Sequence, residues 1–490
     1  MAKEDPPEVE TKAGLVRGFW RPTRGKGGSS RSAAFLGIPF AEAPVGDLRF
    51  KAPVPKKPWK GVKDTLSYGP TAQRGDPGET LIPEPSIPGD STLNVNVFTP
   101  SPKKAAPGEG LPVLVWFHGG GYFAGSPASP WYDGRSFNRD GIVTVTTSYR
   151  LGFDGFGWID STVQNRGVLD WIAALQWVQD NIGAFGGDPD RVTIAGQSAG
   201  GGAVLTLLGC PAAQSLFHGV YALSAPTPDI SAKRAKKFAH EMAGKLGVAS
   251  TLEGFASVSE NAVLKAQKTL TEMQPEDPKE ALEEGMRLAP VVDGDLIPLS
   301  TLESIRSGVG SDKHLVIGAT DDEFAMATSD KKLLRWIPKR VLLEKAGIPK
   351  EDTKAYLAAN EDVAKLGGPR LLGRVITDQV FKVPMLLTVD ARGEAPTWVY
   401  RFSWRSGAYG FALHCVDVPF FFDCLDGPSV DSLAGEKPLQ ELADQVHNAA
   451  VKFVRTGDPG WPRYPIVRVW DQQIEDIPSA FASAYPLLPQ

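Results

Sequence analysis

The sequence has few cysteines and no long hydrophobic run. Only three cysteines, Cys210, Cys415 and Cys424, occur in 490 residues, which argues against a disulfide-rich secreted scaffold and favours a reducing compartment. No window reaches the roughly 18 uninterrupted apolar residues that a transmembrane helix needs. The first ten residues are charged and lack the apolar stretch of a signal peptide. We therefore expect a cytoplasmic protein with no membrane partner.

Charge of one sign does not dominate the chain. Lysine and arginine number 52 against 57 aspartates and glutamates, for a formal net charge of -5. No basic run is long enough to predict a nucleic-acid surface or a polybasic membrane patch, so nucleic acid is not an expected partner. A monomer or a weak homo-oligomer is expected.

Glycine and proline are abundant, with 52 and 41 residues, which predicts many turns and long connections. From residue 111 to 225, short apolar or β-branched runs over 113–117, 142–147 and 192–195 alternate with helical patterns. In the helix predicted over 165–182, apolar residues recur at steps of three and four. This alternation predicts an α/β fold with a large, mostly parallel central sheet covered by helices on both faces.

Helical insertions are predicted about 231–286 and 331–372, where Lys, Glu, Ala and Leu dominate without intervening strands. Further strands are expected over 315–318 and 397–402. No Pro/Ser/Gly-rich linker divides the chain, so residues 1–490 are predicted to form one domain. The glycines of the segment 24–31 do not lie between a strand and the start of a helix, which favours a hairpin loop over a phosphate cradle.

The motif Gly196-Gln197-Ser198-Ala199-Gly200 follows one predicted strand and precedes an apolar helical pattern. In that context Gly-x-Ser-x-Gly forms a sharp turn that exposes the serine hydroxyl at the top of a sheet. Glycines are needed because side chains would clash in so tight a turn. The start of the helix also offers free N–H groups to a developing negative charge. Ser198 is therefore predicted to be a nucleophile.

A second motif, His118-Gly119-Gly120-Gly121-Tyr122, follows the strand predicted over 113–117. Consecutive glycines allow backbone N–H groups to approach a ligand closely. This property suits an oxyanion hole completed by the N–H of Ala199.

A nucleophilic serine needs a base, which a carboxylate must hold in place. The chain has six histidines, and the usual order in this kind of site is serine, acid, histidine. His414, in a loop after the strand predicted over 397–402, fits that order. His447, on a predicted helix, is the weaker candidate.

The acid is expected just past the strand predicted over 315–318. Asp321, Asp322 and Glu323 all lie there, and the residues alone do not decide among them.

Taken together, these motifs resemble the type-B carboxylesterase and cholinesterase family of α/β-hydrolases. Besides the two glycine motifs, the resemblance includes Tyr149-Arg150-Leu151-Gly152, Phe185-Gly186-Gly187-Asp188-Pro189 and the long segment from Phe35 to Phe50. It runs from about Gly14 to Pro465, and the chain resembles a bacterial, p-nitrobenzyl-esterase-like member of the family.

The resemblance implies an α/β-hydrolase fold and a serine esterase without cofactor or metal. The implied roles are nucleophile for Ser198, acid for Glu323, base for His414, and oxyanion donors for Gly120, Gly121 and Ala199. It also implies two structural ion pairs, Arg49 with Asp90 and Arg150 with Asp170. His414 and Asp417 have no third potential ligand nearby in the sequence, so no metal site is expected.

Departures from the family pattern narrow the expected substrates. Thr92 stands where the family has a cysteine, so its usual first disulfide cannot form. The loop over 72–90 has no tryptophan, and Gln197 replaces the family's glutamate beside the nucleophile. Both changes weaken a site for quaternary ammonium groups, so choline esters are not expected substrates.

The expected activity is hydrolysis of uncharged, moderately apolar esters of aryl or short-chain alkyl alcohols. A carbamate or amide hydrolase with the same triad is the alternative, and a non-catalytic interaction protein, as found in the same family, is a remote one. Pocket candidates are residues near the motifs, of which the aromatic ones fit a core position equally well: Tyr122, Phe123, Trp158, Trp171, Gln197 and Phe420.

Overall fold

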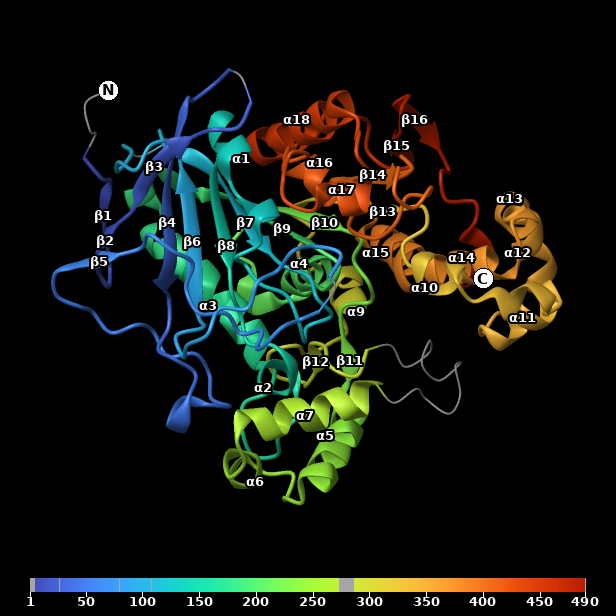
Figure 1. The fold of residues 1–490 in the computed structure, drawn as a ribbon, viewed down its shortest axis with the longest axis horizontal. Coiled ribbons are helices and arrows are strands. Elements are labelled where there is room, and N and C mark those ends of the chain that lie inside the picture. The colour runs from blue at the N-terminus through green and yellow to red at the C-terminus, as the bar shows by residue number, and fades with distance from the viewer. Residues whose placement is uncertain (1–4, 26, 79, 107, 273–285, 490) are drawn as a thin grey trace.

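A computed structural model describes residues 5–25, 27–78, 80–106, 108–272 and 286–489. Its main feature is an 11-stranded sheet, with the strands in the order β16-β15-β14-β13-β10-β9-β7-β8-β6-β4-β3 (Figure 1). In chain order these strands are β3 (Phe19–Pro22), β4 (Arg31–Pro39), β6 (Asn94–Thr99), β7 (Leu111–Phe117), β8 (Val143–Thr147), β9 (Gly187–Gln197), β10 (Gly219–Leu223), β13 (His314–Thr320), β14 (Thr397–Phe402), β15 (Ile466–Trp470) and β16 (Glu475–Pro478).

The central strands, from β8 through β7, β9, β10, β13 and β14 to β15, all pair in parallel. The outer strands β3, β4, β6 and β16 pair antiparallel. The predicted large, mostly parallel sheet is therefore confirmed. Strands β3 and β4, between which most of the segment 24–31 lies, pair antiparallel, so the predicted hairpin is confirmed; residue 26 lies outside the described residues.

Both faces of the sheet are buried, because alternate residues of β7 belong to two different hydrophobic clusters. Val113, Val115 and Phe117 pack with α3 (Arg166–Asn181) and α4 (Ala199–Gly209). Leu114 and Trp116 pack with α16 (Val418–Phe421) and α18 (Gln440–Thr456) on the other face. Alternation along a strand sends successive side chains to opposite faces, so the predicted cover of helices on both faces is confirmed.

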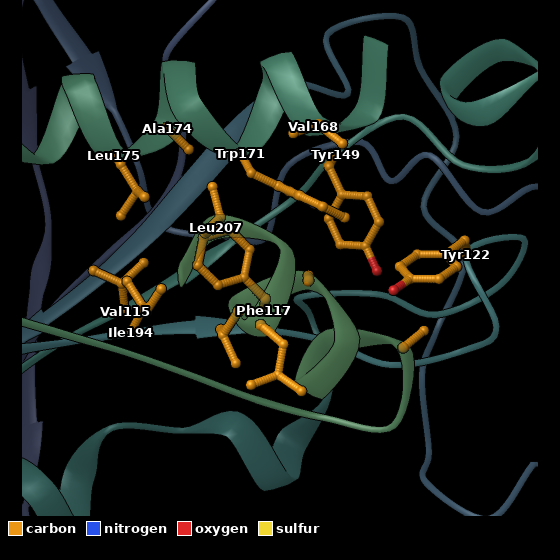
Figure 2. Close-up of a cluster of buried hydrophobic side chains, with 14 of the residues drawn as sticks. Val115, Phe117, Tyr122, Tyr149, Val168, Trp171, Ala174, Leu175, Ile194 and Leu207 are labelled. Atoms are coloured by element: carbon orange, nitrogen blue, oxygen red, sulfur yellow. The ribbon is translucent and has the colours of Figure 1, made fainter. Parts of the chain in front are cut away.

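The helix predicted over 165–182 is α3. Its apolar stripe faces the sheet, as Figure 2 shows for a set of buried side chains from α3 and the strands beneath: Val168, Trp171, Ala174, Leu175, Val115, Phe117 and Ile194.

Smaller elements complete the described structure. The short strands are β1 (Glu8–Thr11), β2 (Gly14–Arg17), β5 (Val62–Asp64), β11 (Ile230–Ser231) and β12 (Val291–Val292). The short helices include α1 (Arg135–Arg139), α2 (Gly152–Phe156), α9 (Thr301–Arg306), α10 (Met326–Ser329), α15 (Val383–Arg392) and α17 (Val430–Ala434). None of the described helices is long and apolar enough to cross a membrane.

The two predicted insertions are helical where the structure describes them. The first contains α5 (Ala232–Leu246), α6 (Leu252–Ala256) and α7 (Glu260–Glu272), and its residues 273–285 lie outside the described residues. The second contains α11 (Lys339–Lys345), α12 (Thr353–Ala359), α13 (Glu361–Lys365) and α14 (Gly368–Thr377). Figure 1 shows the two groups of helices at different places on the rim of the molecule. The division into a single domain stays a prediction.

One of the two ion pairs implied by the resemblance is confirmed and one is wrong. Arg150 donates to both carboxylate oxygens of Asp170, at 2.8 and 2.7 Å, and both side chains are buried. Arg49 instead donates to both oxygens of Asp154, at 2.8 and 3.0 Å. Asp90 is exposed, whereas Asp154 on α2 lies within reach of the guanidinium fork.

We predict that Arg150→Leu lowers the free energy of unfolding by about 3–5 kcal/mol, because it leaves the carboxylate of Asp170 buried without its partner. The urea midpoint, followed by circular dichroism, measures the loss. The control is Arg17→Leu, which removes the exposed pairs of Arg17 with Glu8 and Asp64 and is expected to leave the midpoint nearly unchanged. Equal shifts in the two variants would contradict the prediction.

Candidate active site

Ser198 lies in the turn between β9 and α4. Its backbone has φ 58° and ψ -126°, a conformation that costs a non-glycine residue about 1–3 kcal/mol. Two hydrogen bonds hold the turn: the N–H of Ser198 donates to the Leu223 carbonyl at 2.9 Å, and the N–H of Gly202 donates to the Ser198 carbonyl at 2.9 Å. The predicted strand-turn-helix context of Ser198 is therefore present.

The glycines on either side of Ser198 are required by close approaches within the turn and between the turn and β7. A Cβ on Gly200 would lie 2.1 Å from the Phe117 carbonyl oxygen, and one on Gly196 would lie 2.3 Å from the Gly200 oxygen. No side chain fits such gaps, so glycine is needed at both positions.

The glycine loop after β7 packs directly on this turn. A Cβ on Gly119 would lie 3.2 Å from the Ser198 Cβ. Gly120 and Gly121 follow with φ 100° and 60°, values that favour glycine. Among the described residues, the N–H groups of Gly120, Gly121 and Ala199 donate to no protein acceptor. Three unpaired donors thus lie in the two segments that flank Ser198.

His414 and Glu323 form a buried pair. The Nδ1 atom of His414 lies 2.5 Å from Oε2 of Glu323, and the other carboxylate oxygen accepts from the Thr320 N–H at 2.7 Å. Glu323 follows β13, and His414 lies in the loop after β14. Burial alone lowers the pKa of His414, but the neighbouring Cys415 and Glu323 raise it well above its usual range.

The structure distinguishes the three acids that the sequence left open. Arg401 donates to both oxygens of Asp321. Burial would raise the pKa of Asp321, but the hydrogen bond and charge of Arg401 lower it to about 2. Asp322 pairs with Arg370 and Arg374. Of the three carboxylates, Glu323 is the one that contacts His414.

The other histidines near the site have different surroundings. His447, on α18, has its ring nitrogens 2.8 Å from the Phe421 carbonyl and 3.2 Å from Asp140. His118 stacks on Tyr149 with a centroid distance of 4.5 Å, and burial lowers its pKa to about 4. Neither imidazole is paired with Glu323.

Gln197 contacts the free side of the His414 imidazole. Its Nε2 lies 3.1 Å from the His414 Nε2, and its side chain is buried. An amide N–H that donates to Nε2 requires an unprotonated nitrogen there, so this contact favours the tautomer in which Nδ1–H faces Glu323. Gln197 was expected in the substrate pocket, and the structure places it against His414.

Two aromatic rings flank His414, and the sequence reasoning missed both. The rings of Phe324 and Phe381 have centroids 4.9 and 5.2 Å from the imidazole. Phe324 directly follows Glu323, so its position along the chain was a signal that it lies close to the imidazole of His414. Phe381 lies in a π-helical turn, Asp378–Lys382, between α14 and α15, and this break in helical spacing has no local sequence signature.

Asp417 is a second buried carboxyl near the pair. Tyr400 donates to one of its oxygens at 2.9 Å, while the other has no partner among the described residues. Burial, together with the charge of Glu323, raises the pKa of Asp417 to about 7. The protonated form therefore persists close to neutral pH, which limits the negative charge beside Glu323.

Most of the aromatic pocket candidates belong to the core. Tyr122, Trp171 and Phe420 are fully buried and pack on other aromatic rings. Residues next to these motifs thus fill the space between sheet and helices, and their place in a substrate pocket stays a prediction. Phe123 differs, since 55% of its surface is exposed.

A cavity of about 850 Å³ adjoins the glycine loop at Phe123 and Ala124. Its volume is in the usual range for small-molecule pockets. The apolar part of its lining includes Phe123, Leu151, Phe153, Val263 and Leu264. Three arginines also line it, and each is paired with a carboxylate: Arg49 with Asp154, Arg74 with Glu260 and Arg150 with Asp170.

Comparison with known proteins gives a consistent result. The model of the carboxylesterase family matches residues 5–477. The chain belongs to this family. It is 33% identical to the para-nitrobenzyl esterase of Bacillus subtilis over 452 residues, covering 87% of this chain and 88% of the relative. It is also 33% identical to the phenmedipham hydrolase of Pseudarthrobacter oxydans over 465 residues, covering 88% of each chain.

Solved structures agree with the assignment. A PNB esterase structure has a TM-score of 0.83 at 30% identity, covering 99% of this chain and 100% of the other. A carboxylesterase of Geobacillus stearothermophilus has a TM-score of 0.82 at 30% identity, with the same coverage. The protein has the α/β-hydrolase fold and is a serine carboxylesterase that hydrolyses carboxylic esters, so the resemblance seen in the sequence is confirmed.

We predict that Gln197→Glu raises the pKa of His414 by about one unit or more, because a carboxylate beside Nε2 favours the charged imidazolium. Titration of the histidine resonances by NMR measures the shift, with His414→Gln identifying the resonance. The control is Gln176→Glu on the exposed side of α3, which adds the same charge elsewhere. An unchanged pKa in Gln197→Glu would show that the contact has no electrostatic effect.

Proposed function

We propose that the protein hydrolyses uncharged, moderately apolar esters, of the aryl or short-chain alkyl type, through an acyl-enzyme on Ser198. The observation that carries this proposal is the buried pair of His414 and Glu323 together with the strained turn at Ser198. Activated serine nucleophiles need these parts: a base, a carboxylate that orients it, and donors for the oxyanion.

In the proposed first step, Ser198 Oγ attacks the ester carbonyl carbon and His414 Nε2 takes the hydroxyl proton. The carbonyl oxygen gains the negative charge, which the N–H groups of Gly120, Gly121 and Ala199 stabilise. Glu323 holds Nδ1–H and stabilises the imidazolium. The tetrahedral intermediate collapses, the alcohol leaves with the proton from His414, and the acyl group stays on Ser198.

In the second step a water molecule gives its proton to His414 and attacks the acyl carbonyl. Collapse releases the acid and returns the proton to Ser198. The amide of Gln197 shares Nε2 of His414 in the resting site, so the Ser198 hydroxyl competes with it for one lone pair.

The lining of the cavity next to Phe123 supports the proposal that the substrate is neutral and apolar. Its arginines are paired, and apolar residues make up most of the remaining lining, which also includes Lys268 and uncharged polar side chains. A neutral, apolar ester group buries apolar surface there without breaking an ion pair, whereas an unpaired charge would lose hydration.

A carbamate or amide hydrolase is the second candidate, since acyl transfer from either uses the same serine, base and oxyanion donors. Values of kcat/KM on a matched ester, carbamate and anilide with the same acyl and aryl groups separate the candidates. The highest value for the ester supports the proposal, and a higher value for either of the others replaces it.

A reducing, cytoplasmic setting is also proposed. It is supported by the three buried cysteines, all of which are free thiols.

For the assembly we propose a monomer or a weak homo-oligomer, with no cofactor and no nucleic-acid partner.

We predict that Ser198→Ala lowers kcat by at least about three orders of magnitude, because the covalent route is lost. His414→Ala is expected to have an effect of similar size. Intact-mass analysis after treatment with a fluorophosphonate checks the role directly, since one adduct should form on the parent and none on Ser198→Ala. The control is Ser224→Ala, because Ser224 is also buried near this turn with a positive φ. This variant should still form the adduct. Near-normal turnover by Ser198→Ala would overturn the assignment.

We predict that Phe123→Ala lowers kcat/KM for a benzyl ester about tenfold relative to the ethyl ester of the same acid. The reason is that an aromatic contact contributes about 0.5–1.5 kcal/mol beyond its buried area. Steady-state kinetics on both esters give the ratio. Tyr409→Ala, which removes an exposed aromatic ring outside the cavity, should leave the ratio unchanged. An unaltered ratio in Phe123→Ala would place the alcohol group elsewhere.

A further inference from the structure

One exposed segment combines basic and large apolar side chains. Residues 331–341, here called the basic segment, read Lys-Lys-Leu-Leu-Arg-Trp-Ile-Pro-Lys-Arg-Val and contain no carboxylate. Its five cations are exposed, namely Lys331, Lys332, Arg335, Lys339 and Arg340. Leu333 is 82% exposed and Trp336 is 86% exposed, the highest values among the large hydrophobic residues of the described chain.

The cations of the basic segment are available for an outside partner. Among the ion pairs formed by the described residues, none includes these five side chains. The protein as a whole carries a net charge of -5, so the segment is a local positive region on an acidic molecule. Positive charge of this kind attracts an anionic surface within about 10 Å at ordinary ionic strength.

The exposure of the two apolar side chains does not come from a loosely attached segment. The Leu334 carbonyl packs against Gly368 at the start of α14, where a Cβ would lie only 2.2 Å away. Leu343 then anchors α11 in a small hydrophobic cluster with α12 and α14. The backbone is thus fixed on both sides, and Leu333 and Trp336 project into solvent from a supported position.

We propose that the basic segment docks the protein on an anionic lipid bilayer surface. Trp336 and Leu333 would enter the boundary between headgroups and acyl chains, where tryptophan is favoured. The five cations would lie at the level of the acidic headgroups. A nucleic acid would satisfy the charge but would leave the apolar side chains in water, so the lipid surface fits both properties.

The basic segment lies next to elements that carry residues around the candidate active site. It follows α10, which directly succeeds the Glu323 and Phe324 positions, and α14 holds Asp322 through Arg370 and Arg374. Figure 1 shows α10, α11 and α14, the helices next to the segment, at the end of the molecule farthest from β3. The docking proposal does not depend on which ester the enzyme hydrolyses. The proposal differs from the expectation, drawn from the sequence, that the protein has no membrane partner.

Cosedimentation with vesicles tests the proposal. The full chain is mixed with phosphatidylcholine vesicles that contain either no phosphatidylglycerol or about 30 mol% of it. We expect a partition coefficient at least about 100-fold higher on the anionic vesicles, falling as NaCl is raised from about 0.05 to about 0.5 M. Equal partition on both kinds of vesicle, or none on either, would overturn the proposal.

Two variants separate the contributions. Lys331→Gln with Lys332→Gln and Arg335→Gln should lower partition about 100-fold, since each cation contributes about a factor of five. Leu333→Ser with Trp336→Ser should lower it about tenfold and should remove the part that persists at high salt. Circular dichroism and turnover of a water-soluble ester report whether each variant is folded.

The controls remove the same kinds of side chain elsewhere. Lys57→Gln with Lys60→Gln and Lys63→Gln removes three exposed charges outside the segment, and Leu66→Ser removes an exposed leucine. Both are expected to bind like the parent protein. A loss as large as in the segment variants would show unspecific attraction and overturn the proposal. A dimer in analytical ultracentrifugation that Trp336→Ser dissociates, without vesicle binding, would assign the segment to self-association instead.

Discussion

The carboxyl ends of β7 and β9 approach each other so closely that side chains cannot fit between the turns that follow. Phe117 lies opposite Gly196 in the parallel ladder, and its carbonyl oxygen occupies the place of a Cβ on Gly200. The glycine loop then packs on Ser198 through Gly119. This contact brings the strained serine and the unpaired N–H groups of both segments together, and the other parts of the site are arranged around it.

The charge near the site is controlled by giving each acidic side chain a separate partner. Asp321 and Asp322 are paired with arginines, and Tyr400 donates to Asp417, whose raised pKa reduces its charge. Glu323 is left for the imidazole of His414. Because a second free carboxylate would compete for the same proton, this separation keeps one acid and one base in a defined pair.

The two helical insertions contribute different surfaces to a common sheet. The first supplies α7, whose Val263 and Leu264 line the cavity beside the glycine loop. The second begins with the basic segment and includes α14, which is tied to Asp322. The sheet fixes the segments that carry Ser198, Glu323 and His414, while the insertions add surfaces outside the sheet, as is typical of segments outside the core of a fold.

Sequence alone determined the features whose chemistry is local. Alternating apolar runs predicted the parallel sheet, and contiguous motifs located Ser198 and the glycine loop, because tight turns demand glycine at specific positions. Tertiary structure decided what depends on distant partners. The acids after β13 are neighbours in sequence and differ through Arg401, Arg370 and Arg374, which come from other elements. Phe381 reaches His414 through a π-helical turn, and Arg49 takes Asp154 instead of Asp90. Burial and pairing arise only when remote segments meet, so no local pattern encodes them.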